Sequence, residues 1–143
     1  MASYDELKLK EYKHWTLYLH GNQCYLGRAY AWLKRPGEMQ KLSDITEEER
    51  DSLWYTTMRR YELAIARLWQ PDHMNYSWLG NEFAAHQGHG HLHLIPRYQH
   101  EVHFAGEIFT DDRWGQNYAP YPKVEFADDK LFAIRDALRK ELK

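Results

Sequence analysis

Three histidines stand two residues apart in the stretch HGHLHLIPRY, residues 89–98, and they are His89, His91 and His93. Side chains alternate between the two faces of a β-strand, so on an extended chain these imidazoles point the same way, about 6–7 Å apart. An imidazole has an unperturbed pKa near ~6.5, so the row would supply proton donors, proton acceptors and a nucleophile at neutral pH. The spacing therefore predicts acid–base or nucleophilic chemistry on a group, such as a phosphate, that more than one ring can contact.

Two other uses of these histidines remain open from the residues alone. One is structural, with partly buried strand histidines whose hydrogen bonds are satisfied. The other is a metal site, because imidazole is a common zinc ligand and three can leave an open catalytic position. A straight strand, however, spreads the outermost pair over roughly 13 Å, whereas zinc–nitrogen bonds are about 2.0 Å long. The three rings cannot easily converge on one ion, so we expect no metal ligands here.

The strands that position this row are predicted from apolar runs bounded by turn residues. Trp15–Leu19 and Ala29–Leu33 are rich in aromatic and aliphatic residues, and the short connection between them predicts an antiparallel hairpin. Further strands are expected at 75–79, at 88–97 and, briefly, at Val102–Phe104. The histidine row is therefore expected to lie entirely on a strand.

Two helices complete the expected elements. Thr46 to Glu49 has the form of a capping box, because the threonine hydroxyl can accept from the amide three residues on and the glutamate can reach back. Apolar residues then recur at steps of three and four until near Trp69, where Pro71 disfavours helical geometry. The segment 128–142 has the same spacing. Residues 98–126, after the triad, contain glycines, prolines and many aromatic residues without a clear period. We expect this segment to form an ordered irregular excursion.

Composition limits the class of protein. A length of 143 residues with 43% hydrophobic residues fits one domain with a core, and an aromatic content of 15% is a hint of association. A net charge of −2 gives no strong field for a nucleic-acid polymer or an anionic membrane. The one cysteine, Cys24, cannot form an internal disulfide, and no apolar stretch approaches the roughly 20 residues that cross a bilayer. We expect a soluble cytoplasmic protein without a secretory leader.

The order His-x-His-x-His, two apolar residues, Pro and Arg resembles the signature of the histidine triad (HIT) family of nucleotide hydrolases and transferases. The resemblance extends to YLGRAYAWLKR, to the long helix from Thr46 and to MNYSWLGN ahead of the triad. The segment PRYQHEVHFAGEIFTDDRWGQNYAPYP is similar to a diadenosine tetraphosphate hydrolase-like branch of the family. The resemblance implies an α+β, HIT-like antiparallel sheet with one long helix and a C-terminal helix, as a single HIT domain over residues 1–143, assembled as a homodimer.

The resemblance also implies roles for particular residues. His91 would attack the α-phosphate of a nucleotide, giving a nucleotidyl-histidine intermediate that water resolves. His93 would hydrogen-bond the phosphate or leaving group, and His89 would hold its neighbour's orientation. Asn81 matches a family asparagine that contacts phosphate.

Several positions depart from the better-known family members. The loop 82–88 is shorter and carries an additional histidine, so His86 or Gln87 could replace a missing hydroxyl as a phosphate contact, with an ordinary surface histidine as the alternative. Arg28 stands where many members have a histidine and could bind phosphate bidentately, or be simply a solvated charge. An acidic ribose contact is absent near residue 20, which leaves Asn22 as its substitute.

The function expected from this resemblance is hydrolysis at the α-phosphate of a nucleotide conjugate. Dinucleoside polyphosphates such as diadenosine tetraphosphate are the leading expected substrates, followed by phosphoramidates and adenylates. No cofactor is expected, although a divalent cation could accompany a polyphosphate substrate. The alternatives are a catalytically weak nucleotide-binding module of the same fold and a metal-dependent hydrolase.

Overall fold

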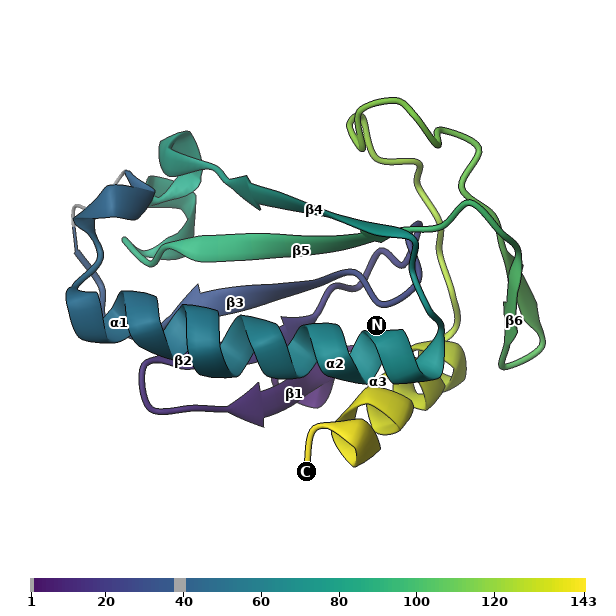
Figure 1. Ribbon diagram of the computed structural model, residues 1–143, viewed down its shortest axis with the longest axis horizontal. Helices are drawn as coiled ribbons and strands as arrows, with labels where there is room; N and C mark the ends of the chain where they lie inside the picture. The colour runs from purple at the N-terminus through teal and green to yellow at the C-terminus, as the bar shows by residue number, and fades with distance from the viewer. Residues whose placement is uncertain (1, 38–40) are drawn as a thin grey trace.

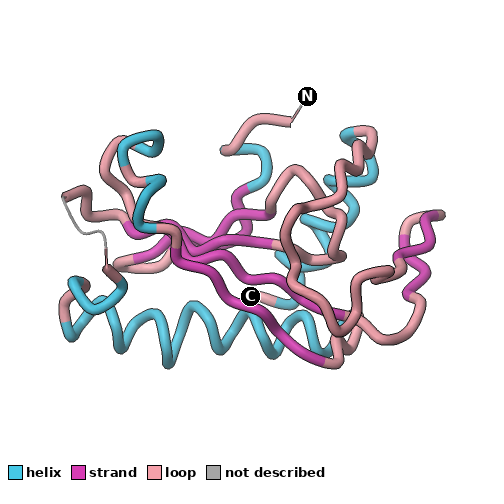
Figure 2. Tube along the Cα trace, turned by 90° about the horizontal axis from the view of Figure 1, so that it is seen from above, coloured by secondary structure: helices cyan, strands magenta, loops and turns pink. Residues whose placement is uncertain are grey.

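Five strands form one antiparallel sheet in the computed structural model of this protein, which describes residues 2–37 and 41–143. The strand order is β1-β2-β3-β5-β4, and a separate hairpin pairs β6 with β7 (Figure 1). Figure 2 shows the long helix lying along one face of the sheet. The predicted α+β architecture is confirmed. Its elements are β1 (Lys8–Glu11), β2 (Trp15–Leu19), β3 (Ala29–Leu33), α1 (Glu47–Ser52), α2 (Met58–Leu68), β4 (His73–Trp78), β5 (His91–Arg97), β6 (Val102–Phe104), β7 (Glu107–Phe109) and α3 (Asp128–Glu141).

The β2–β3 hairpin has the predicted bounds and the predicted antiparallel pairing. On its other edge β3 pairs with β5, which also pairs with β4, so β5 lies between two neighbours. In this register Tyr30 is opposite His93 and Trp32 is opposite His91. Directly opposite residues share a face of the sheet, so the strand pairing places aromatic rings beside the histidines.

The long helix begins as its capping box predicts. The Thr46 hydroxyl accepts from the Glu49 amide at 3.1 Å, and the Glu49 carboxylate accepts from the Thr46 amide at 2.8 Å. The same carboxylate accepts two bonds of 2.8 Å from Arg35, which ties the helix start to the chain after β3. The helix is not uniform, however, because a π-helical turn at Leu53–Thr57 separates α1 from α2.

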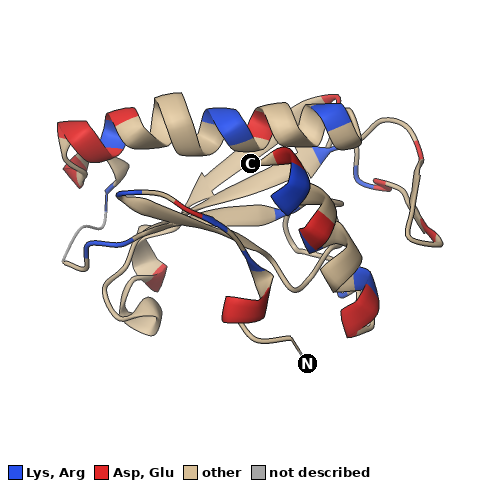
Figure 3. Cartoon of the chain, turned by 90° about the horizontal axis from the view of Figure 1, so that it is seen from below, with Lys and Arg blue, Asp and Glu red and all other residues tan. Residues whose placement is uncertain are grey.

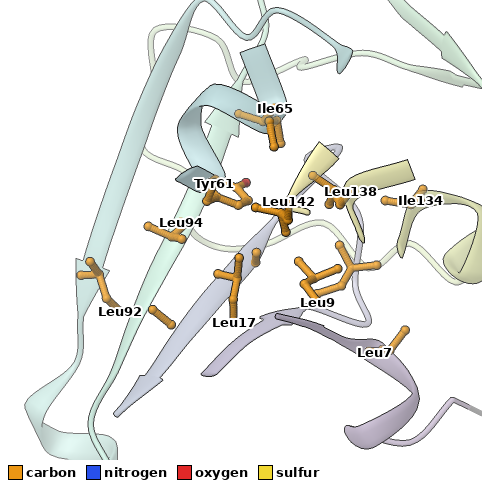
Figure 4. Close-up of a cluster of buried hydrophobic side chains, with 14 of the residues drawn as sticks. Leu7, Leu9, Leu17, Tyr61, Ile65, Leu92, Leu94, Ile134, Leu138 and Leu142 are labelled. Carbon is orange, nitrogen blue, oxygen red and sulfur yellow. The ribbon is translucent and has the colours of Figure 1, made fainter. Parts of the chain in front are cut away.

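The core lies between the sheet and the helices. Figure 4 shows Leu17, Leu92 and Leu94 of the sheet gathered with Tyr61 and Ile65 of α2. Full burial of one such aliphatic side chain stabilises the fold by roughly 1.5–3 kcal/mol. Helix α3 packs beside β1 and extends this core with the following residues: Leu7, Leu9, Leu131, Ile134, Leu138 and Leu142.

Strand β5 starts later than expected. The sequence predicted a strand from residue 88, but regular pairing begins at His91, and His89 precedes it. The reason is a turn, since Gly88 has a left-handed φ of +78° and the His89 amide donates to the His86 carbonyl at 3.0 Å. At Gly90 a β-carbon would lie 2.3 Å from the Trp78 ring, so only glycine fits there.

Three further differences concern elements rather than the site. Strand β4 begins at His73 and ends at Trp78, slightly earlier than predicted, and the predicted short strand β6 has a partner, β7, that the sequence did not indicate. The charged β1, KLKE, was not predicted either. Figure 3 shows acidic and basic residues along the helices, with the central strands mostly uncharged. Among the described residues, no helix is both long and apolar enough to cross a membrane.

Candidate active site

A cavity of about 640 Å³ opens beside the central strands. Its strand residues alternate along β2, β3 and β5 with those of the helix-side core, so it lies on the sheet face that the long helix does not cover. Histidine and aromatic rings dominate its walls. The residues lining it are Tyr4, Tyr18, His20, Arg28, Tyr30, Trp32, Leu79, Glu82, Ala85, His86, Gln87, His91, His93 and Tyr121.

His91 and His93 lie together at the floor of this cavity. Their ring centroids are 4.8 Å apart, and the two side chains are 5% and 8% exposed. Tyr30 contacts both rings at centroid distances of 6.0 and 6.2 Å, and Trp32 stacks near His91 at 6.0 Å. The rigid strand pair therefore fixes both imidazoles against aromatic neighbours.

Two more histidines extend the pair into a row of four. The His86 ring lies 4.5 Å from that of His91, and the His20 ring lies 6.4 Å from that of His93. His86 was predicted as a site residue and lines the cavity. His20 was not proposed, although it follows β2 two residues after Tyr18 and so continues the face on which Tyr18 lies. That alternation was the signal that could have identified it.

His89 does not line the cavity, in contrast to the predicted row of three. Its ring stacks on Trp32 at 4.8 Å, and its Nδ1 lies 2.7 Å from the Leu33 carbonyl oxygen. Trp32 in turn stacks near His91. His89 is therefore placed to hold Trp32, which supports His91, and not to contact a molecule in the cavity.

Several buried polar atoms at the site have no hydrogen-bond partner within residues 2–37 and 41–143. They are Nδ1 of His91, both ring nitrogens of His93, Nε of Arg28 and the Tyr121 hydroxyl. Buried polar groups in proteins are nearly always hydrogen-bonded, and exceptions call for a reason such as a catalytic role. Their concentration around one cavity is what a site that binds a polar ligand requires.

Burial keeps these imidazoles neutral. Desolvation, aided by the positive charges of neighbouring groups including Arg28, lowers the pKa of His93 to about 3 and that of His20 to about 4. Burial also lowers the pKa of His91, with His86 as a second cause, while Glu82 opposes the shift. A neutral imidazole retains the lone pair that nucleophilic attack needs, so His91 is in the reactive form at pH 7.

Arg28 brings the positive charge of the cavity. The side chain is 3% exposed, and its guanidinium carbon lies 3.5 Å from the centroid of the Tyr121 ring. Asn22, predicted as a ribose contact, does not line the cavity. Its side-chain amide donates to the Pro122 carbonyl at 2.9 Å and accepts from the Cys24 amide at 3.2 Å, so it anchors the excursion that carries Tyr121.

The loop before β5 contributes the remaining predicted residues. Gln87 is exposed and lines the cavity, and its φ of 57° places it in the left-handed turn that reverses the chain. Asn81 is exposed and does not line the cavity. Glu82, which the sequence did not single out, does line it. Only the folded loop could reveal this carboxylate, because an isolated glutamate in a polar loop carries no signal of its own.

No protein-family model matches the sequence, and no curated protein matches it. Solved structures do match. A histidine triad protein from Bradyrhizobium japonicum has a TM-score of 0.68 and 17% identity, over 95% of this chain and 90% of its own. A hypothetical histidine triad nucleotide-binding protein from Sulfolobus tokodaii has a TM-score of 0.65 and 16% identity, over 95% and 83%.

A HIT-like protein from Bartonella henselae is similar in the same way, with a TM-score of 0.62 and 16% identity, over 94% of this chain and 85% of its own. All three likenesses extend over nearly the whole described sheet and its helices. Identities this low carry information about architecture and none about substrate. The chain therefore has the fold of the histidine triad proteins.

Proposed function

We propose that this protein is a HIT-family enzyme that hydrolyses nucleotide conjugates through a histidine nucleophile. The observation that carries the proposal is the position of His91. Its ring lies at the floor of a cavity, against a second neutral imidazole from His93, in the middle of a His-x-His-x-His stretch. The fold alone would support nucleotide binding, and the histidine geometry supports the chemistry.

The proposed reaction has two displacements at one phosphorus atom. The Nε2 lone pair of His91 attacks the α-phosphorus, the phosphorus–leaving-group bond breaks, and the leaving group departs with its electron pair and takes up a proton. Water then attacks the same phosphorus, the phosphorus–nitrogen bond breaks, and a nucleoside monophosphate leaves while the imidazole is restored. Splitting one difficult displacement into two easier ones is the benefit of covalent catalysis.

The surrounding groups fit charge stabilisation during both steps. His93 can hydrogen-bond a non-bridging oxygen, and the buried cation of Arg28 can bind phosphate. His89 acts through Trp32 as a positioning residue. None of these steps calls for a metal, so we propose catalysis without a cofactor. A divalent cation could still accompany a polyphosphate substrate.

Dinucleoside polyphosphates such as diadenosine tetraphosphate are the leading proposed substrates, followed by adenylates and phosphoramidates. A cavity of about 640 Å³ is within the range of roughly 300–1,000 Å³ that holds small-molecule ligands. Tyr30, Trp32 and Tyr121 offer ring faces at its walls, and base–aromatic stacking is worth about 1–3 kcal/mol in nucleic-acid binders. One nucleoside and its phosphates can occupy this space, with the leaving half directed to solvent.

The covalent intermediate gives the most direct test. The protein is mixed with diadenosine tetraphosphate, quenched at alkaline pH within milliseconds to seconds, digested and analysed by mass spectrometry. We expect one adenylyl group on the peptide that contains His91, and loss of that group during a chase. Turnover retained in His91→Asn, or an adduct on another residue, would exclude His91 as the nucleophile.

A nucleotide-binding module without turnover is the second candidate. The observation that favours it is Glu82, whose carboxylate lines the same cavity and would repel a polyphosphate. Such a protein would bind adenosine monophosphate while leaving a panel of adenylyl, guanylyl and phosphoramidate conjugates intact. The same panel therefore decides between the two functions.

We also propose that the chain forms a homodimer. Trp54 and Tyr55 on the long helix are 58% and 65% exposed, and Tyr76 on the edge strand β4 is 43% exposed. Exposed aromatic side chains beside an unpaired strand edge are favourable for association. Sedimentation should give twice the 17.3 kDa of one chain, and a Trp54→Glu variant should shift the protein towards the monomer.

A further inference from the structure

Three potential metal ligands converge where the loop before β5 meets the cavity. One ligand atom each from Glu82, His86 and His91 lies within 4.8 Å of the other two. We propose that these side chains bind one divalent transition-metal ion, with Zn²⁺ as the expected ion, and that the bound ion blocks His91 as a nucleophile. The metal site stands independently, whereas its inhibitory effect rests on the proposed function.

The backbone of the loop creates this convergence. Gln87 and Gly88 both have left-handed backbone angles, with φ of 57° and +78°, so the chain reverses between His86 and β5. The His89 amide closes the turn by donating to the His86 carbonyl at 3.0 Å. The result is that the His86 ring returns over the His91 ring, with centroids 4.5 Å apart and planes at 81°.

In the described chain the two histidine ligands make ring contacts, such as that of His86 edge-on to Trp32 at 6.0 Å, but no polar ones. Within the described part of the chain, neither the Glu82 carboxylate nor the His86 ring makes a hydrogen bond or an ion pair, and Nδ1 of His91 is enclosed without a partner. Binding a metal here would therefore break no side-chain hydrogen bond. Because Nδ1 of His91 is enclosed, Nε2 is the nitrogen that can reach an ion.

The ligand distances need only a local adjustment. Zinc–nitrogen and zinc–oxygen bonds of about 2.0–2.2 Å in a tetrahedron place ligand atoms roughly 3.3 Å apart. His91 is held by β5, whereas Glu82 and His86 are half-buried residues on short turns and can close the difference by side-chain rotation. The site thus has one fixed ligand and two adjustable ones.

The donor set selects the kind of ion. Two imidazoles and one carboxylate suit zinc and similar transition metals, whereas Mg²⁺ and Ca²⁺ prefer oxygen ligands. Three protein ligands leave a fourth position for water or a phosphate oxygen, and here that position would face the cavity. This set differs from the three-histidine site considered from sequence, since it takes only His91 from the triad.

Metal binding and nucleophilic attack need the same electron pair. Once Nε2 of His91 donates to an ion, that lone pair is not available to phosphorus. Metal at this site would therefore prevent formation of the nucleotidyl-histidine intermediate while leaving the fold intact. Removal of the ion by a chelator would restore formation of the nucleotidyl-histidine intermediate.

Direct metal titration tests the site without reference to activity. The metal-free protein is titrated with Zn²⁺ by calorimetry and with Co²⁺ by visible absorption, which reports coordination geometry. We expect one ion per chain and tetrahedral or five-coordinate Co²⁺ bands. Affinity should fall more than about 10-fold in Glu82→Gln and in His86→Asn, because loss of a ligand costs more than loss of a group that only orients one. The matched control is His103→Asn, which alters an exposed Glu101–His103 pair at 2.8 Å and should leave affinity unchanged.

Three results would overturn the metal site: no stoichiometric binding by the wild type, unchanged affinity in both loop variants, or an equal loss in the His103→Asn control. The blocking effect is tested by adenylyl labelling of His91 with and without saturating Zn²⁺. Labelling should fall at least 10-fold in the wild type and much less in Glu82→Gln, and unchanged labelling would overturn the blocking. If labelling is absent even without metal, the proposed function fails while the titration still decides the metal site.

Discussion

The two halves of β5 carry buried polar side chains on the same face of the sheet, but the side chains of the two halves differ in their hydrogen bonding. Near the C-terminal end, Arg97 is 4% exposed and donates to the Asp111 carboxylate at 2.6 and 3.1 Å and to three further oxygens. Near the N-terminal end, neither ring nitrogen of His93 has a hydrogen-bond partner within the described chain. The difference teaches that polar groups serving the fold are satisfied internally, whereas the ring nitrogens at the cavity stay available for the ligand of the proposed function.

Replacing His91, the proposed nucleophile, should give the largest effect and should act on activity alone. His91→Asn is expected to reduce kcat/KM for the preferred conjugate roughly 10⁴-fold or more, as loss of a covalent nucleophile does in other enzymes. Its effect on the free energy of unfolding should be below about 1.5 kcal/mol, because no hydrogen bond to Nδ1 is lost. Steady-state kinetics and urea unfolding measure the two quantities. A large loss of stability with preserved turnover would reverse the assignment of this half of the strand.

Breaking the other half of the strand should affect stability. Arg97→Met leaves the Asp111 carboxylate, whose side chain is 2% exposed, without its cation, and loss of one partner of a buried pair costs about 3–5 kcal/mol. Urea unfolding at pH 7 measures the loss. The matched control is Arg50→Met in the exposed Arg50–Asp51 pair, where a change below about 1 kcal/mol is expected. Equal effects in the two variants would show that the Arg97 network does not hold the fold.

The buried histidines around the cavity should also make stability depend on pH, and His20, which follows β2, is the clearest case. Burial lowers the pKa of His20 from 6.5 to about 4, so the unfolded chain binds the proton more readily than the folded one. This contribution is fully present above pH 6.5 and is lost as the pH falls towards 4. Between pH 6.5 and 5, where most carboxylates stay ionised, it amounts to about 1–2 kcal/mol. His20→Asn should flatten this part of the curve, and an unchanged slope would rule out His20 as its source.

Replacing the His93 ring with an apolar ring should give the smallest change in the free energy of unfolding. Unlike most core substitutions, it should be neutral or stabilising. His93→Phe removes two buried ring nitrogens without partners, and replacing unpaired polar atoms with an apolar group of similar shape is nearly neutral or stabilising, here by up to about 1 kcal/mol. Turnover should fall at the same time, since the proposed phosphate contact of His93 is lost. Thermal unfolding with parallel kinetics checks both. A loss above about 2 kcal/mol would mean that this ring is needed by the fold.

Regular elements with their own local signals were predicted well. The bounds of β2 and β3 follow from apolar runs closed by turn residues, and the helix start follows from the Thr46 capping box. Strand β1 was not predicted because Lys8–Glu11 is mostly charged, with Leu9 as its one buried residue. Pairing with β2 at the sheet edge makes it a strand, and pairing is a tertiary property.

The site was predictable where it depended on strand alternation. Residues 91 and 93 share a face as expected, and Trp32 and Tyr30 were placed beside them only by the register of β3 against β5. The turn at Gly88 removed His89 from the row, and the fold of the same loop brought in Glu82. Left-handed turns and cross-strand register are set by packing over the whole sheet, so the histidine pattern alone could not predict either.

One wall of the cavity comes from far along the chain, because Tyr121 packs on Arg28 at 3.5 Å and the Tyr25 hydroxyl donates to the Tyr118 carbonyl at 2.9 Å. That excursion supplies none of the histidines that line the cavity. In the proposed enzyme, substrate selectivity and reactivity would therefore be encoded in separate stretches of sequence and could diverge independently. Grafting a different excursion onto the same sheet would then change the substrate and leave the cavity's histidines in place.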